Sequence, residues 1–198
     1  MSKVTLEQIQ HLRQMTGVGM MDCKKALIEA DADLTKAAEL LRKKGAAVAE
    51  KRAGNATAEG LVHAYIHPGA QVGVLLELNC ETDFVARTAD VKQFAQDVCM
   101  HIAALKPLCV SSAQIDPAYL EKERTFFTEQ LREQGKPEKM IEEIVEGKIK
   151  KTYADGCLVE QKFVKNNQIT VGDLLKELIA KMGESIKIAR FARFEIGA

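Results

Sequence analysis

The chain contains no tryptophan, and only 5% of its 198 residues are aromatic. Its hydrophobic core must therefore consist mainly of aliphatic side chains, drawn from the 46% of residues that are hydrophobic. The sequence also lacks an apolar run long enough to span a bilayer, and its first residues, Met1–Glu7, do not form a signal peptide. These absences predict a cytoplasmic protein that does not bind membranes.

The chain has no excess of charge of either sign, because 28 Lys and Arg residues balance 28 Asp and Glu residues. Without a basic excess to neutralise phosphates, nucleic-acid binding is not expected. One basic stretch, Lys148–Lys151, follows Glu142, Glu143 and Glu146. The local field there largely cancels, which favours a solvated helix end over a nucleic-acid site.

Five cysteines are present, an odd number, and none of them forms a Cys-x-x-Cys pair. This pattern argues against a disulfide framework and against a structural zinc site. We expect reduced thiols.

The sequence contains no convincing group of residues for enzyme catalysis. His63 and His67 share one face of an expected strand but would lie about 13 Å apart, whereas two Zn–N bonds together span about 4 Å. Cys80 beside one of these histidines is conceivable as a nucleophile, but nothing marks it as an activated thiolate. We therefore expect neither a catalytic residue nor a metal site.

Nucleotide-binding motifs are incomplete as well. Gly17-Val18-Gly19 lacks the third glycine and the preceding strand of a dinucleotide fingerprint, and Gly135-Lys136 lacks the upstream glycine of a phosphate-binding loop. The sequence predicts no bound cofactor and no direct contact with a nucleotide.

The first 46 residues predict three short helices. Thr5 and Asp33 are suited to cap the first and third, a second helix is expected over residues 22–30, and Gly45 suggests a left-handed cap that ends the third. A bundle of this size resembles a ubiquitin-associated domain. Residues 47–60, rich in Ala, Gly, Asn, Lys and Glu, predict a mobile linker, part helix and part coil.

Residues 61–198 predict a core of antiparallel sheet with flanking helices, which makes the fold class α+β. Residues 158–164 fit neither state clearly. The expected elements are strands 61–67 and 72–78, a helix over 88–105, a helical hairpin over about 117–151, a helix over 170–182 and a last strand over 185–196.

The segment Asn79–Arg87 places an acid, Asp83, beside Phe84 at a strand-to-helix junction. A buried phenylalanine contributes roughly 2 kcal/mol of hydrophobic free energy, so a solvated ring calls for a reason. Two interpretations are open: Phe84 folds back as a staple onto the next helix, or Asp83 and Phe84 form an exposed plug aimed at another protein.

Met20 and Met21 present a similar choice, because adjacent residues of a short helix cannot both face one core stripe. One methionine packs inside while the other is exposed by chance, or the pair forms an adaptable apolar contact with Arg13 and Val18 nearby.

The sequence resembles the bacterial elongation factor Ts family over its whole length. The resemblance rests on several motifs in the family's order: Thr16–Leu27, Asn79–Arg87, Glu146–Lys148, Glu160–Val164, Val171–Glu177 and Arg190–Gly197.

This resemblance implies a guanine-nucleotide exchange factor that binds elongation factor Tu·GDP and promotes GDP release without covalent chemistry. It assigns Thr82, Asp83, Phe84 and Val85 to a loop that disturbs the magnesium and phosphate site of the partner. It also implies that Arg13, Val18, Met20 and Met21 contact the partner's nucleotide domain.

Longer members of the family contain two related core subdomains, whereas this sequence shows no internal repeat and a single core. We therefore expect a homodimer, and a complex with two copies of each protein. The alternative from another class is a non-catalytic adaptor that uses its ubiquitin-associated-like domain to bind another protein.

Overall fold

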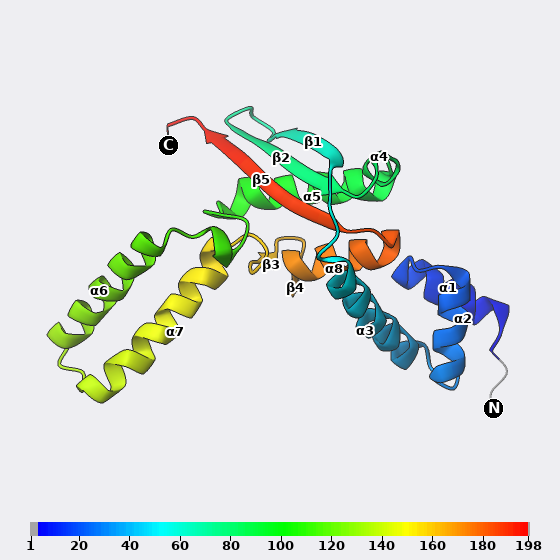
Figure 1. Cartoon of the computed structure of the whole chain (residues 1–198), viewed down its shortest axis with the longest axis horizontal. Coiled ribbons are helices and arrows are strands. Elements are labelled where there is room, and N and C mark those ends of the chain that lie inside the picture. The colour runs from blue at the N-terminus through cyan, green and yellow to red at the C-terminus, as the bar shows by residue number, and fades with distance from the viewer. Residues whose placement is uncertain (1–3, 198) are drawn as a thin grey trace. The chain divides into compact units, whose positions relative to one another are not determined.

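The computed structural model describes residues 4–197 (Figure 1). Within them, no helix combines the length and the apolar character needed to cross a membrane. The elements in chain order are α1 (Leu6–Thr16), α2 (Met20–Glu29), α3 (Leu34–Arg52), β1 (Glu59–Ile66), β2 (Val72–Cys80), α4 (Asp83–Ala86), α5 (Ala89–Leu105), η1 (Ser112–Gln114), α6 (Pro117–Glu133), α7 (Glu138–Gly156), β3 (Lys162–Phe163), β4 (Asn166–Thr170), α8 (Val171–Met182) and β5 (Ile186–Glu195).

Three strands form an antiparallel sheet in the order β1-β2-β5, which confirms the predicted α+β class. Residues 158–164, whose secondary structure the sequence left open, contain β3, which pairs with β4 as a separate two-stranded sheet. Its register is irregular, with Lys162 opposite Thr170 and Phe163 opposite Asn166. A strand of two residues shows no alternation, so the sequence could not predict it.

The chain forms two compact units, each assembled from separate stretches of sequence. The first contains the described residues up to Val62, together with Glu77–Ala95 and Leu174–Lys187. The second contains His63–Leu76, Gln96–Asp173 and the described residues from Ile188 onward.

In the first unit, helices α1, α2 and α3 enclose a small aliphatic core. Thr5 closes a capping box with Gln8: the Gln8 N–H donates to the threonine hydroxyl at 3.2 Å, and the Thr5 N–H donates to the glutamine side chain at 3.0 Å. Asp33 caps α3 as predicted, accepting the Lys36 N–H at 3.0 Å. The buried side chains of this core are Ile9, Leu12, Cys23, Ala26, Leu27, Ala30, Ala37 and Leu41.

The expected cap at Gly45 is wrong, because α3 continues through it to Arg52 and past the expected linker start at residue 47. A Cβ at Gly45 would lie only 2.7 Å from the Cβ of Ala180 in α8. The missing side chain therefore allows a close approach of two helices, a constraint that comes from a segment more than a hundred residues away in the chain.

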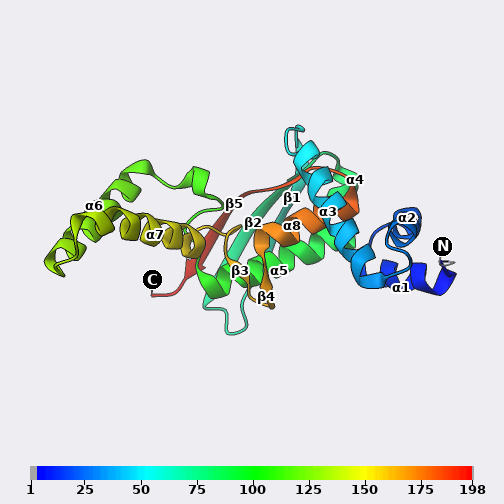
Figure 2. The same ribbon diagram turned by 90° about the horizontal axis from the view of Figure 1, so that it is seen from below.

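In the second unit, α5 lies along the strands (Figure 2). Arg193 of β5 donates to the carbonyl oxygen of Ala103 at 3.2 Å, and the His63 ring of β1 pairs with the Gln96 side chain at 2.7 Å. The side chains of Val98 and Ile102 on α5 are fully buried, and their spacing of four residues places them on one face of this helix.

The predicted helical hairpin is confirmed by α6 and α7, which lie side by side in both views (Figures 1 and 2). Asp116 caps α6 by accepting the Ala118 N–H at 2.9 Å, and Gly135 turns the chain with φ +72°. The buried side chains between the two helices are Leu131, Ile141, Val145 and Ile149.

Two glycine substitutions test the close approach at Gly45. We expect Gly45→Ala to lower the free energy of unfolding by roughly 1–2 kcal/mol, because an overpacking cost towards the upper end of roughly 1–3 kcal/mol outweighs the gain of up to about 1 kcal/mol in helix propensity. Gly147→Ala in α7 is the matched control: its Cβ would meet nothing within 4 Å, so it should stabilise the protein. Denaturant unfolding measures both changes, and a stabilised Gly45→Ala protein would contradict the packing described.

Candidate functional site: a capped acidic–aromatic helix

The segment between β2 and α5 forms a short helix, α4, with a well-defined start. Thr82 has extended backbone angles and is its N-cap, with its hydroxyl accepting the Val85 N–H at 3.4 Å. Ala86 is buried at the end of the helix. A capped turn of this kind fixes the direction in which the side chains of residues 83–85 project.

Phe84 is 79% exposed, the highest exposure among the large hydrophobic side chains of residues 4–197. The ring does not fold back onto a neighbouring helix, so the staple interpretation is wrong. Beside it, Asp83 forms an ion pair with Arg87 at 2.8 Å, at the i, i+4 spacing that brings side chains together on a helix. The exposed ring of Phe84 thus follows Asp83, whose carboxylate is held in one orientation by this ion pair.

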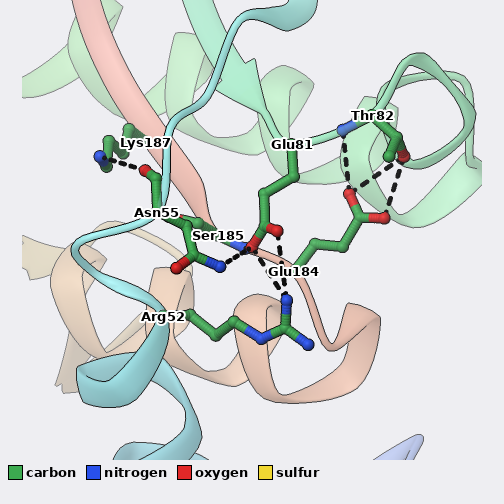
Figure 3. A network of polar contacts seen from close by, with 7 residues as sticks. All are labelled: Arg52, Asn55, Glu81, Thr82, Glu184, Ser185 and Lys187. Carbon is green, nitrogen blue, oxygen red and sulfur yellow. Dashed lines mark hydrogen bonds and ion pairs between the residues drawn. The ribbon is translucent and has the colours of Figure 1, made fainter.

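Glu184 anchors the start of α4 from a distant part of the sequence (Figure 3). Its carboxylate accepts the backbone N–H of Thr82 at 3.1 Å and the threonine hydroxyl at 2.9 Å. The hydroxyl can donate to Glu184 while it accepts from Val85, so both roles of Thr82 are compatible. These are charge-assisted hydrogen bonds, stronger than neutral ones.

Glu81 makes the complementary contacts in the same network (Figure 3). It accepts the backbone N–H of Ser185 at 2.6 Å, the amide of Asn55 at 3.0 Å and the guanidinium of Arg52 at 3.2 Å. The Ser185 N–H, followed by the Asn55 amide and Arg52, holds the pKa of the Glu81 carboxyl below its ordinary value. Lys187 adds a bond to the carbonyl oxygen of Asn55 at 3.1 Å.

Sequence reasoning singled out Thr82, Asp83, Phe84 and Val85, and the structure places them on one capped turn. It missed Glu184, which lies 102 residues from its partner Thr82, and also Arg52 and Asn55. A lone glutamate after a helix gives no local signal. Only the pairing of the two segments in three dimensions reveals its role.

The residues weighed as catalytic candidates have ordinary structural roles. Burial, with a smaller contribution from the charge of Glu184, raises the pKa of the Cys80 thiol to about 11, which leaves it protonated and unreactive. His63 pairs with Gln96, and His67 with Tyr65 at 2.9 Å. Within residues 4–197, no three His, Cys, Asp or Glu side chains are grouped so as to hold a metal ion.

The four residues predicted in the N-terminal helices differ in exposure. Arg13 is exposed and Met21 is 64% exposed, whereas Val18 and Met20 are half-buried and pack against the small aliphatic core. The two methionines thus divide, one packing inward and the other facing solvent. Met15 of α1 is also 59% exposed.

Taken together, these features define a class: an α+β protein that holds a short acidic–aromatic helix firmly at a strand-to-helix junction and keeps the aromatic ring in solvent. A family model described as "Elongation factor TS" matches residues 9–198. The chain belongs to the elongation factor Ts family, a family of translation elongation factors.

Curated relatives named elongation factor Ts are similar to this chain over nearly their full length. Elongation factor Ts of Desulfotalea psychrophila is 53% identical over 195 residues, covering 98% of this chain and 99% of the relative. That of Desulfosudis oleivorans is 50% identical over 197 residues, covering 100% of both. That of Fervidobacterium nodosum is 49% identical, covering 98% of this chain and 99% of the relative.

The lowered pKa of Glu81 predicts an acid-dependent loss of stability. Because the folded-state pKa lies below the ordinary value of 4.5, the contribution of Glu81 is fully present above that value. It is lost as the pH falls through the folded-state pKa. We expect Glu81→Gln to unfold more easily than the unsubstituted protein at pH 7, and the difference to shrink towards pH 3.

Chemical denaturation of both proteins across this pH range measures the difference directly. Using the difference cancels the titration of carboxylates that the two proteins share. A gap that stays constant or widens in acid would show that the charge of Glu81 contributes nothing to the network.

Proposed function

We propose that this chain is the guanine-nucleotide exchange factor of elongation factor Tu, binding the Tu·GDP complex and promoting release of GDP during translation elongation in the cytoplasm. The observation that carries the proposal is the 79% exposed ring of Phe84 on a helix whose start is anchored by Glu184. A ring held in solvent is available to a partner, and its anchored backbone loses little freedom on binding.

The proposed mechanism is mechanical rather than chemical. GTP-binding proteins hold their nucleotide through its phosphates and a magnesium ion. Phe84 would insert between helices of the partner's nucleotide domain and displace the elements that position the phosphate loop and the magnesium ligands. Asp83 would hold the partner by hydrogen bonding and would not ligate the metal. The protein would therefore act without covalent chemistry, a cofactor or a nucleotide of its own.

The energetic basis is mutual exclusion. The exchange factor and GDP favour different states of the partner, so each weakens the binding of the other by the same factor. Thr82 and Val85 contribute by fixing α4, since the cap bond between them sets the direction of Phe84.

A second contact would come from the N-terminal helices. Arg13 and Met21 are exposed there and supply a charge and a flexible apolar side chain. Val18 and Met20 would hold this contact surface in place, because both pack against the aliphatic core.

We further propose that the protein acts as a homodimer through the uncovered face of its three-stranded sheet. Within the second unit, this face carries a shallow groove of about 510 Å³ lined by β1, β2 and β5. Its apolar walls include Ile66, Leu75, Phe194 and Ile196, all of them exposed. An apolar face of this kind marks an interaction surface, and two-fold pairing is the commonest self-association. With partner bound, the assembly would contain two copies of each protein.

Removing the ring of Phe84 tests the mechanism. We expect Phe84→Ala to slow the stimulated release of labelled GDP from elongation factor Tu by tenfold or more, about 1.4 kcal/mol. Phe126→Ala is the matched control, since it removes a ring that is also exposed, at 57%, from helix α6. Both proteins should keep their thermal stability. Full stimulation by Phe84→Ala would rule out the wedge, whereas an absence of stimulation by the unsubstituted protein would favour the adaptor interpretation.

The N-terminal contact is tested by a double substitution. Arg13→Ala with Met21→Ala should weaken binding to elongation factor Tu by about tenfold, because both side chains would be buried by the partner. Ile28→Ala, which truncates another exposed residue of α2, should bind normally. Calorimetric titration gives the affinities, and equal affinity for the double variant and the control would place the contact elsewhere.

The homodimer is tested by light scattering at micromolar concentration. We expect a mass near twice the 21.9 kDa of one chain. Phe194→Asp, which places a charge on the apolar face, should give the single-chain mass, whereas Phe126→Asp should not. A single-chain mass for the unsubstituted protein, with full exchange activity, would mean that one core suffices.

A further inference from the structure

Two of the five cysteines lie at the base of the helical hairpin, next to each other in space. The sulfur atoms of Cys109 and Cys157 are 3.7 Å apart. Cys109 lies in the connection between α5 and α6, and Cys157 directly follows the last residue of α7. The two thiols therefore bracket the whole hairpin, at a separation of 48 residues in the chain.

Backbone hydrogen bonds hold this pair in place. Cys109 and Cys157 are partners in an isolated parallel bridge. The Leu158 N–H donates to the carbonyl oxygen of Cys109 at 2.9 Å, and the Leu108 N–H donates to that of Gly156 at 2.8 Å. Neighbouring strands lie about 4.8 Å apart, within the Cα separation of roughly 4.4–6.8 Å that a disulfide accepts. Side-chain rotation alone can bring the sulfurs to bonding distance.

The two thiols have different surroundings. Cys109 is partly exposed, and its thiol donates to the carbonyl oxygen of Ser111 at 3.3 Å. Cys157 is completely buried, and this burial, followed by its hydrogen bond with Cys109, raises the pKa of its thiol to about 12. A reagent from solvent therefore reaches Cys109 first. Cys157 lies beside it as a protonated thiol.

We propose that Cys109 and Cys157 form a reversible dithiol–disulfide site that reacts with small-molecule disulfides, Cys109 as the attacking thiol and Cys157 as the resolving one. In the first step, the Cys109 thiolate attacks one sulfur of the reagent, its S–S bond breaks and one small thiolate leaves. In the second, Cys157 gives up its proton and attacks the Cys109 sulfur, the mixed disulfide bond breaks and the second small thiolate leaves; the two small thiolates take up the protons that the two cysteines lost. Two protein thiols are oxidised, and one small disulfide is reduced to two small thiols.

Closing this bond would constrain the hairpin at its base. The new covalent link joins the residue after α7 to the segment that leads into α6, and it restricts a long loop in the unfolded chain. The oxidised protein should accordingly unfold at a higher temperature than the reduced one. This site is independent of nucleotide exchange, and its test needs no partner.

The test is incubation of the whole protein with glutathione disulfide, followed by thiol counting and mass spectrometry. We expect the free thiols to fall from five to three, with no glutathione mass retained and with the peptides of Cys109 and Cys157 joined. A reducing dithiol should restore all five. Cys99→Ala, which removes a buried cysteine of α5, is the matched control and should also lose two thiols.

Single substitutions separate the two roles. Cys157→Ser should retain one glutathione on Cys109, because the resolving thiol is missing. Cys109→Ser should remain unmodified, because Cys157 is buried. Circular dichroism verifies that both variants are folded.

Three results would overturn the proposal. They are a stable glutathione adduct on Cys109 in the unsubstituted protein, no loss of thiols at all, and a loss of two thiols from Cys109→Ser.

Discussion

The exchange of backbone contacts between residues 81–82 and residues 184–185 is the interaction on which the candidate site depends. Glu184 accepts the N–H of Thr82, and Glu81 accepts the N–H of Ser185. Each glutamate thus binds the residue that follows the other glutamate. Each carboxylate is occupied by hydrogen-bond donors, and Arg52 adds a positive charge beside Glu81.

This arrangement explains how Phe84 can remain in solvent. Leaving its ring exposed forgoes roughly 2 kcal/mol of burial that a looser loop would recover by folding back. The Thr82 cap and its bonds to Glu184 remove that freedom, because the backbone is fixed at the N-cap of α4. The ordering cost is met during folding, so it does not reduce the affinity for a partner.

Local signals in the sequence were sufficient for most elements of the fold. The caps at Thr5 and Asp33 follow from a side chain and a backbone amide three residues apart. The stripe of α5 follows from its helical period. Prediction failed where the residue that matters is distant in the sequence. Gly45 was predicted to end a helix, whereas its contact with Ala180 explains why a glycine is needed there. The role of Glu184 depends on its hydrogen bonds to Thr82, which the sequence does not reveal.

The same distinction applies to the candidate site. Residues 82–85 stand out because an acid and an aromatic at a strand end are unusual in themselves, and the family resemblance gave them a role. Their exposure required the structure, since the same residues allowed a staple. Helical geometry required only that Met20 and Met21 not both face the core. The structure shows that Met20 packs against the core and that Met21 is exposed.

The scarcity of aromatic side chains gives their placement added weight. A chain without tryptophan and with seven phenylalanines must build its core from smaller side chains, and each ring left in solvent is one withheld from that core. Phe84 and Phe194 are nevertheless 79% and 66% exposed. One projects from a capped turn and the other from an apolar sheet face, and these are two different means of contact. A convex ring suits insertion into a cleft of another molecule, whereas a flat apolar face suits a second flat face. The first is consistent with the proposed insertion into elongation factor Tu, and the second with the proposed pairing of two copies of this chain.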